Sequence, residues 1–245
     1  MYAHRCRRPP FVANPTKVIK GTFSPYIGPS EKVSEALISE LLVRFSTSEG
    51  YDMYPDVLPF FRMLKQASTE RARAENEATW RWEKTVVGII TNSDDRVASV
   101  LSSFGLKVGP RRVGGPSHRI AGVSPYNDIQ FVVLSYDVGY EKPDHRIFDA
   151  AIEMLKETLA SDPATFGESV NEYEKLYVGD SLGKDYLGAE ASGWNAVYMD
   201  RSDVRTPQLD LLYDLLLKDF DSGEERLIQV CTNLDALTRW EPMNS

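Results

Sequence analysis

The sequence lacks the features of secreted, membrane-spanning and nucleic-acid-binding proteins. Its two cysteines, Cys6 and Cys231, are too few and too far apart for a disulfide framework. No apolar run approaches the roughly 20 residues that a membrane span requires. The net charge is -8, whereas nucleic-acid binding requires a basic surface. We therefore expect neither a nucleic-acid nor a membrane partner, and we expect a reducing compartment, the cytoplasm or the nucleus.

Further absences concern motifs. No Gly-x-Gly-x-x-Gly follows a predicted strand, which argues against a dinucleotide-binding Rossmann domain. The start, MYAHRCRRPPF, has arginines but no apolar segment, so it does not resemble a secretory signal peptide. No aspartate precedes Asp52. What is present is a chain of 245 residues, which is long enough for one α/β domain with a sizeable core and a smaller appendage.

Residues 173–200 carry the most informative pattern. They predict an apolar strand, a Gly-Asp at its carboxyl end, an acidic loop, a helix of small residues and a second apolar strand. In an open α/β sheet, groups just beyond the carboxyl end of a strand face the ligand crevice. Asp180 and Asp185 are therefore candidate ligands of one magnesium ion. The alternative is that Asp185 caps the following helix and that Gly179-Asp180 only forms a turn.

Two other segments place polar groups at strand ends. Residues 86–94 predict a strand that is buried on both faces and ends in Thr91 and Asn92. Residues 131–148 predict a second such strand, then a glycine turn and the sequence Lys-Pro-Asp at 142–144, in which Asp144 is a typical N-cap. Lys142 lies between a strand and a helix, from where an ammonium group can reach an anion in the crevice. The alternative for Lys142 is an ordinary surface lysine.

In this order and at these separations, the segments resemble the haloacid dehalogenase superfamily. Thr91 matches its second motif, Lys142 its third, and Asp180 with Asp185 its fourth, Gly-Asp-x-x-x-x-Asp. The resemblance runs from about Asn14 to the C-terminus and is greatest to the group of haloacid dehalogenase-like hydrolase domain-containing protein 3. It implies an α/β fold with a Rossmann-like parallel sheet and a partial helical cap. We expect the first strand of the family's core to be missing from this chain.

The resemblance also implies roles for these residues. Members of the family hydrolyse small phosphate esters through an aspartyl-phosphate, with magnesium neutralising the phosphoryl charge. Thr91 and Asn92 would then bind the phosphoryl group, and Lys142 would offset its charge. Asp180 would ligate magnesium, with Asp185 as a second ligand or as an orienter of bound water. Ser181 is a weaker candidate in the same loop, and a small phosphorylated metabolite is the expected partner of an active protein.

The first motif of the family, an apolar strand ending in Asp-x-Asp-x-Thr, is not found. Asp52 follows Ser-Glu-Gly rather than an apolar strand, and Asp200 has the wrong spacing to its neighbours. We therefore expect the chain as written to lack the nucleophile, either because it is truncated or because it is a non-catalytic protein that binds phosphate or another protein. The oligomeric state is left open.

The pattern divides the chain into a start that does not resemble the family (1–13), a remnant of the helical cap (14–54) and an α/β core (55–245). The expected elements outside the motifs are helices at 31–45, from Pro55 onward, at 95–104, 207–217 and 233–240, an irregular insert at 107–128 with a basic loop, and a final edge strand at 226–231. Trp80 and Trp82 are expected to attach the polar segment 66–84 to the body.

In the family, the first-motif strand lies between the strands of the second and fourth motifs. Without it, each flanking strand keeps unpaired backbone groups, which cost roughly 1–3 kcal/mol apiece when buried. Three outcomes are open: the flanking strands pair directly, residues 10–20 fill the gap, or the protein is longer than this sequence.

Overall fold

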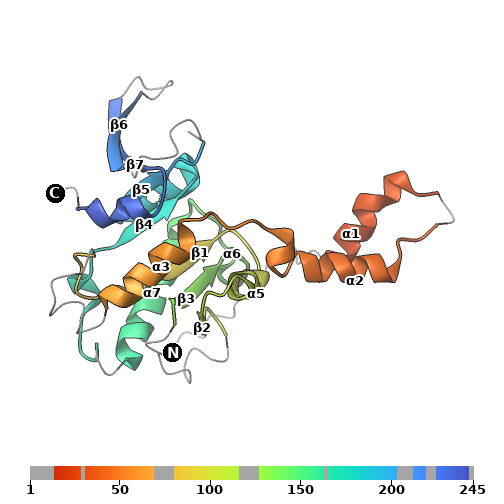
Figure 1. Cartoon of the computed structure of the whole chain (residues 1–245), viewed down its shortest axis with the longest axis horizontal. Coiled ribbons are helices and arrows are strands. Elements are labelled where there is room, and N and C mark those ends of the chain that lie inside the picture. Colours follow the sequence, from red (N-terminus) through yellow and green to blue (C-terminus); the bar gives the residue numbers. More distant parts are fainter. Residues whose placement is uncertain are drawn as a thin grey trace.

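The computed structural model describes residues 14–28, 31–68, 80–115, 127–162, 165–202, 212–218 and 225–242. They form two β-sheets flanked by helices, from which a pair of helices and a β-hairpin project (Figure 1). Within these ranges, no helix combines the length and the apolar composition needed to cross a membrane.

The first sheet contains β1 (Gly88–Thr91), β2 (Val108–Arg112) and β3 (Ile129–Leu134), in the order β1-β3-β2 and all parallel. β3 is buried along nearly its whole length, as expected of a central parallel strand covered on both faces. Gly88 lies opposite Phe131, and a Cβ on Gly88 would come within 2.2 Å of the Phe131 ring. The close approach of this ring therefore requires glycine at position 88.

The second sheet contains β4 (Leu176–Gly179), β5 (Asn195–Met199), β6 (Leu212–Lys218) and β7 (Glu225–Cys231), in the order β4-β5-β7-β6. β4, β5 and β7 are parallel to one another, and β6 joins β7 in an antiparallel hairpin. The hairpin projects from the body at the top of Figure 1. The strands of the second and fourth motifs, β1 and β4, are thus in different sheets.

The facing edges of β1 and β4 pair with no strand in the described part of the chain. A side chain makes the link instead: the Tyr177 hydroxyl of β4 donates to the Ile90 carbonyl of β1 at 3.0 Å. Direct pairing of the two strands, one of the three outcomes considered, is therefore wrong. Filling of the gap by residues 10–20 is wrong for the described part of that segment, because α1 (Pro15–Phe23) is a helix.

One helix packs against both sheets on the same face. α7 (His145–Ser161) begins at Asp144, whose side chain accepts a hydrogen bond from the Arg146 amide, so the predicted cap is confirmed. Its apolar residues share one core with Phe131 of β3 in the first sheet and with Tyr177 of β4 in the second. The residues of α7 in this core are Ile147, Phe148, Ala151, Met154, Leu155 and Leu159.

A second helix joins the sheets on the opposite face. α3 (Val57–Ala67) packs Phe60 against Val197 of β5, while its Phe61 packs against Val132 of β3. Since neighbouring residues of a strand point to opposite faces, Val132 lies on the face that α7 does not cover. The predicted attachment of the segment before β1 is confirmed as well: Trp80 packs edge-on against Phe60, and Trp82 lies 5.4 Å from the Trp240 ring.

α1 and α2 (Glu35–Arg44) form the projecting helical pair at the right of Figure 1. They contact each other, and Lys20 Nζ donates to Glu35 at 2.8 Å. Of the described residues in these two helices, only Ile38 is buried. The assignment of residues 14–54 to a cap and of 55–245 to the core stays a prediction.

The remaining elements are short. They are α5 (Arg96–Ser103), α6 (Ser135–Val138), α8 (Leu187–Ala191), the 3-10 turns Ser24–Tyr26, Ser48–Gly50, Val170–Glu172 and Asp235–Arg239, and the π-helical turn Leu182–Tyr186.

Three sequence predictions are wrong. The insert 107–128 contains a strand, β2, because its residues alternate between buried and exposed against β3. Leu212–Lys218 is a strand rather than the end of a helix 207–217, since it pairs along its whole length with β7. β7 is accordingly an interior strand, and β6 is the edge. Residues 116–126 and 203–211 lie outside the described residues.

An ion pair fastens the start of α3 to the second sheet. Arg201, just after β5, donates two hydrogen bonds to Asp56, at 3.0 and 2.8 Å, and the Leu234 amide donates a third. Burial raises the pKa of Asp56, but the bonds from Arg201 and Leu234 outweigh it and hold the pKa below its usual value. The Asp56 side chain is 8% exposed and joins three segments that are distant in sequence.

We expect Asp56→Ala to lower the free energy of unfolding by about 3 kcal/mol, because it leaves the Arg201 charge without its partner. Since the folded pKa of Asp56 is lowered, this contribution is present above the usual carboxyl pKa and is lost as the pH falls through the folded value. Urea unfolding at neutral and acidic pH measures both effects. Asp52→Ala, an exposed position, is the control; equal losses for the two variants would contradict the prediction.

Candidate functional site

The residues of the three motifs lie at the carboxyl ends of the strands that flank the gap. Thr91 is the last residue of β1, and Asp180 directly follows β4. Lys142 comes from the loop between α6 and α7, which leaves β3 at its carboxyl end. Asp185 lies in the π-helical turn after β4. Parallel strands present these ends at one edge, which is where α/β sheets bind ligands.

Asn92 fixes the loop that carries Lys142. Its side-chain amide donates to the Lys142 carbonyl at 3.1 Å, and its amide oxygen accepts from the Lys142 backbone N–H at 2.7 Å. Both groups of one asparagine therefore hold both backbone groups of one residue. Asn92 therefore positions the Lys142 backbone, and the phosphate-binding role that the family resemblance implies for it stays a prediction.

The Lys142 ammonium group lies in a buried polar cluster. It donates to Asp185 Oδ1 and to the Tyr177 hydroxyl, each at 2.6 Å. The side chains of Lys142 and Asp185 are 11% and 6% exposed, so the ion pair is shielded from water. The alternative interpretation of Lys142 as an ordinary surface lysine is therefore wrong. An ammonium group has three N–H donors, and these two bonds use two of them.

Tyr177 connects this cluster to the other sheet. Its hydroxyl lies 3.2 Å from Asp185 Oδ1 and donates to the Ile90 carbonyl of β1. Burial, and then the charge of Asp185, raise the pKa of Tyr177, so that its phenol stays protonated and remains a donor. Sequence reasoning missed this residue; a hydroxyl inside the apolar strand LYVG was the available signal, because a buried tyrosine requires a polar partner.

Both carboxylate oxygens of Asp185 are engaged. Oδ1 accepts from Lys142, and Oδ2 accepts from the Ser181 amide at 2.9 Å. A Cβ on Gly179 would come within 2.5 Å of the Asp185 carboxyl carbon, so glycine makes room for this side chain. The helical cap in this loop is Ser181, whose hydroxyl accepts from the Lys184 amide. The interpretation of Asp185 as an N-cap is therefore wrong.

Asp180 and Thr91 differ from these residues. Asp180 is exposed, and its carboxylate makes no hydrogen bond or ion pair with another described residue. Thr91 is partly buried, and its hydroxyl makes no hydrogen bond within the same ranges. The structure therefore brings Asn92, Lys142 and Asp185 into contact and leaves Thr91 and Asp180 unengaged at neighbouring strand ends.

The described residues contain no group of three or more His, Cys, Asp or Glu side chains that could hold a metal ion. Asp180 supplies one free carboxylate, and Asp185 is occupied by Lys142 and Ser181. Magnesium usually keeps several waters and binds one or two carboxylates together with a phosphate of the substrate. The chemistry of these residues is compatible with such a water-rich site, in which Asp180 would be the carboxylate available to the ion.

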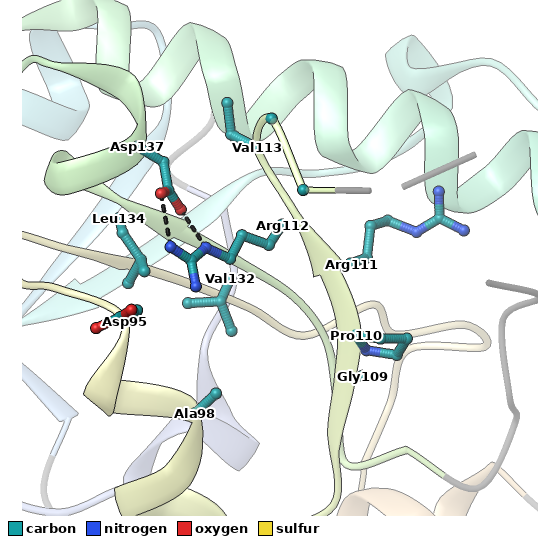
Figure 2. Close-up of a pocket in the computed structure, with 12 residues that line it drawn as sticks. Asp95, Ala98, Gly109, Pro110, Arg111, Arg112, Val113, Val132, Leu134 and Asp137 are labelled. Carbon is teal, nitrogen blue, oxygen red and sulfur yellow. Dashed lines mark hydrogen bonds and ion pairs between the residues drawn. The ribbon is translucent and has the colours of Figure 1, made fainter. Parts of the chain in front are cut away.

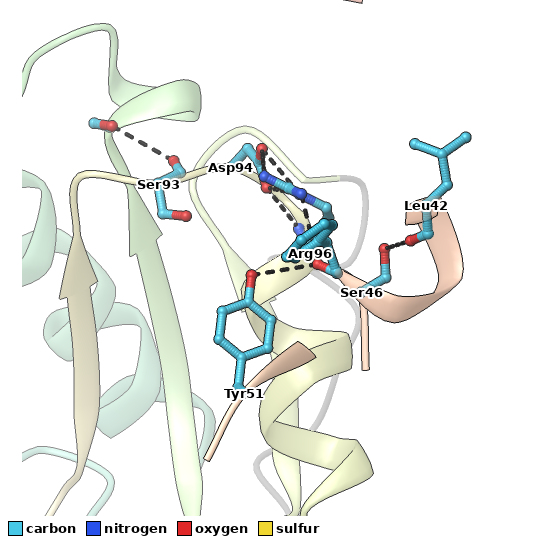
Figure 3. A network of polar contacts seen from close by, with 8 residues as sticks. Leu42, Ser46, Tyr51, Ser93, Asp94 and Arg96 are labelled. Carbon is cyan, nitrogen blue, oxygen red and sulfur yellow. Dashed lines mark hydrogen bonds and ion pairs between the residues drawn. The ribbon is translucent and has the colours of Figure 1, made fainter. Parts of the chain in front are cut away.

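A second polar network connects the loop after β1 to the segment before α3. Arg96 donates to both oxygens of Asp94, at 2.9 and 3.1 Å from Nε, and these bonds hold the pKa of Asp94 below its usual value. Arg96 also reaches the Phe45 carbonyl, which accepts from the Tyr51 hydroxyl as well (Figure 3). The base of the projecting helical pair is thus attached next to Asn92 and Lys142.

A cavity of about 470 Å³ lies beside this edge, between α5, β2 and α6. Arg112 crosses it and donates two hydrogen bonds to Asp137, at 2.5 and 2.8 Å (Figure 2). Arg111 points the other way and pairs with Glu157 at 3.7 Å. The basic loop predicted within the insert 107–128 comprised Arg111, Arg112, His118 and Arg119. For Arg111 and Arg112 this prediction is wrong, because they belong to β2 and are paired; His118 and Arg119 lie outside the described residues.

The chain is similar to several known proteins. No protein-family model matches the chain. A Schizosaccharomyces pombe protein described as an uncharacterized hydrolase is 31% identical over 184 residues, 75% of this chain and 60% of that protein. Haloacid dehalogenase-like hydrolase domain-containing protein 3 of Danio rerio is 25% identical over 140 residues, 57% of this chain and 45% of that protein.

Among solved structures, a HAD phosphatase from Thermococcus onnurineus is similar with a TM-score of 0.41 and 21% identity, over 71% of this chain and 60% of that one. The chain therefore spans less than two thirds of the length of each of these proteins.

We expect Tyr177→Phe to lower the free energy of unfolding by about 1–3 kcal/mol, because it removes the donor to the buried Ile90 carbonyl and one partner of Lys142. Urea unfolding measures the change. Tyr26→Phe, at a side chain that is 85% exposed, is the matched control. An equal effect of both substitutions would show that the hydroxyl does not stabilise the contact between the sheets.

Proposed function

The chain belongs to the haloacid dehalogenase superfamily, and we propose that its strand-end cluster is the phosphoryl-binding part of a phosphatase site. Thr91 and Lys142 would bind the phosphoryl group of a small phosphate ester, and Asp180 would ligate magnesium. The family membership is supported by the three ordered motifs and by the two curated relatives.

The observation that carries the proposal is the position of the Lys142 ammonium group, which two hydrogen bonds fix. This group is held at the carboxyl edge by Asp185 and Tyr177, with one N–H donor left over. An ammonium group that is shielded from water interacts more strongly with an anion than one in bulk solvent. Thr91, with an unengaged hydroxyl at the neighbouring strand end, supplies a second donor. The pair suits a phosphoryl group, which offers several oxygen acceptors.

The role of magnesium follows from the charges. When bound, the ion would neutralise charge on the phosphoryl oxygens. Asp180 has a free carboxylate for it, while Asp185 would act through Lys142 and the Ser181 amide, as a positioning residue. Of the two aspartates of the fourth motif, Asp180 would therefore bind the metal ion and Asp185 would position Lys142.

The sequence as written contains no Asp-x-Asp-x-Thr, so the proposal concerns binding and makes no claim of turnover by the 245 residues alone. Hydrolysis of the ester would require an aspartate nucleophile from another segment of the protein. The second candidate function, favoured by this same absence, is a non-catalytic protein that retains a phosphate-binding cleft or serves as a scaffold for a protein partner.

The test is calorimetric titration of the 245-residue protein with inorganic phosphate in the presence of magnesium. We expect Lys142→Ala to weaken phosphate binding by about 10- to 100-fold, the range for loss of a hydrogen bond to a charged group. Lys156→Ala, an exposed lysine on α7, is the control. Absence of phosphate binding by the unsubstituted protein would refute the proposal.

Lys142→Ala also leaves Asp185 buried without its partner and can unfold the protein. Asp180→Asn avoids this problem, because Asp180 is exposed and unpaired. We expect it to remove the effect of magnesium on phosphate binding while the melting temperature stays unchanged, with Asp52→Asn as the control. Release of p-nitrophenol from p-nitrophenyl phosphate should stay at background, and turnover that depends on Asp180 would show that another carboxylate acts as the nucleophile.

A further inference from the structure

Within the described residues, β6 is the outer strand of the projecting hairpin and of the second sheet. β6 pairs with β7 over all seven of its residues, and its other edge pairs with no strand in the described ranges. A strand edge presents a row of unpaired N–H and C=O groups that another strand can bind. Native proteins often blunt such an edge with charged side chains, proline, a bulge or a very short strand, and of these features β6 has only the charged side chains Asp214 and Lys218.

The exposed face of the hairpin is apolar at its centre. Leu216 of β6 is 56% exposed, and Leu227, directly opposite on β7, is 49% exposed. The two side chains are neighbours on the same face of the sheet, since directly opposed residues of an antiparallel pair project together. Leu216 and Leu227 therefore form a small apolar patch beside the outer edge of β6.

The charges on β6 specify its partner. Asp214, Leu216 and Lys218 alternate along the strand and therefore share the face of Leu227. If two copies of β6 pair antiparallel about Leu216, Asp214 of each copy lies opposite Lys218 of the other. Leu216 then meets Leu216. The arrangement has one unlike-charge pair on each side of a row of four leucines, two from each copy.

Other pairings lack this complementarity. Antiparallel pairing about Leu215 sets Asp214 opposite Leu216, which places a charge against an apolar side chain. Parallel pairing in register sets Asp214 opposite Asp214 and Lys218 opposite Lys218, and like charges directly opposite are destabilising. The residue opposite Lys218 within its own chain is Glu225, so each lysine in the favoured arrangement lies between two carboxylates.

We propose that β6 is the interface of a two-fold symmetric homodimer, in which β6 pairs antiparallel with β6 of a second copy about Leu216. The pairing joins the two four-stranded sheets into one continuous sheet. It is isologous, because the same patch on both copies makes the contact, and it therefore closes at two chains. The strand-end cluster lies outside it, since its residues come from β1, β4 and the loops that follow β3 and β4.

The first test is the mass of the full chain by light scattering across a dilution series. We expect twice 27.6 kDa at high concentration, falling toward 27.6 kDa on dilution. A monomer at every concentration would refute the proposal and would leave the edge to an extended segment of a different protein. A species larger than a dimer would refute the closed two-fold arrangement.

The second test uses charge reversal. Asp214→Lys alone sets lysine opposite lysine twice, and Lys218→Asp alone sets aspartate opposite aspartate twice. We expect either substitution to raise the dissociation constant of the dimer by about tenfold or more. An equimolar mixture of the two variants restores both unlike-charge pairs, so it should dimerise again with one chain of each kind. Asp52→Lys, away from the hairpin, should dimerise like the unsubstituted chain.

The mixture separates a broken interface from a misfolded chain, because misfolded variants do not regain a dimer when they are combined. Dimers of unchanged affinity in both single variants would show that β6 is not the interface. Weakened single variants whose mixture stays monomeric would show that the register about Leu216 is wrong.

Discussion

The contact between Tyr177 and Ile90 is the one on which the arrangement of the two sheets depends at the ligand-facing edge. Among the described residues β1 and β4 do not share a ladder, and a side chain links their facing edges instead. Tyr177 supplies this link from within β4, and it is held by Asp185 and Lys142. α7 and α3 complete the connection by packing across both sheets from opposite faces. Apolar packing therefore holds the two halves together, and one hydroxyl sets their alignment.

The same side chains have two tasks. Lys142 and Asp185 form a shielded ion pair next to the Tyr177 hydroxyl, and Lys142 is also a candidate group for binding a phosphoryl group. A buried ion pair is costly to desolvate and stabilises a fold less than its Coulomb attraction suggests. Under the proposed function, its presence between two sheets is explained by the need for a fixed ammonium group at the ligand edge rather than by stability. Asn92 supports this view, because it holds the Lys142 backbone by both of its groups.

The sequence was sufficient for what depends on local pattern. The apolar runs gave β1, β3, β4 and β5, and Asp144 gave the start of α7. The sequence was insufficient where strand pairing between distant segments determines the secondary structure. β2 contains proline and two arginines, and it is a strand because it pairs with β3. β6 has the leucine-rich composition of a helix, and it is a strand because it pairs with β7. At the site, the motifs predicted Lys142 and Asp185 as candidates. Their ion pair and the contact with Tyr177 could not be predicted, because sequence spacing does not give distances in space.

Gly179 and Asp180 are adjacent in the chain, yet variants at the two positions should behave in opposite ways in a population or a mutational library. Any side chain at position 179 displaces Asp185 and with it the alignment of both sheets, so the protein itself would be depleted from the cell. At position 180 the side chain is exposed and contacts no other described side chain, so a substituted protein would accumulate normally and, under the proposed function, would lose only magnesium binding. Measuring abundance alone would therefore classify the more chemically important of the two residues as dispensable.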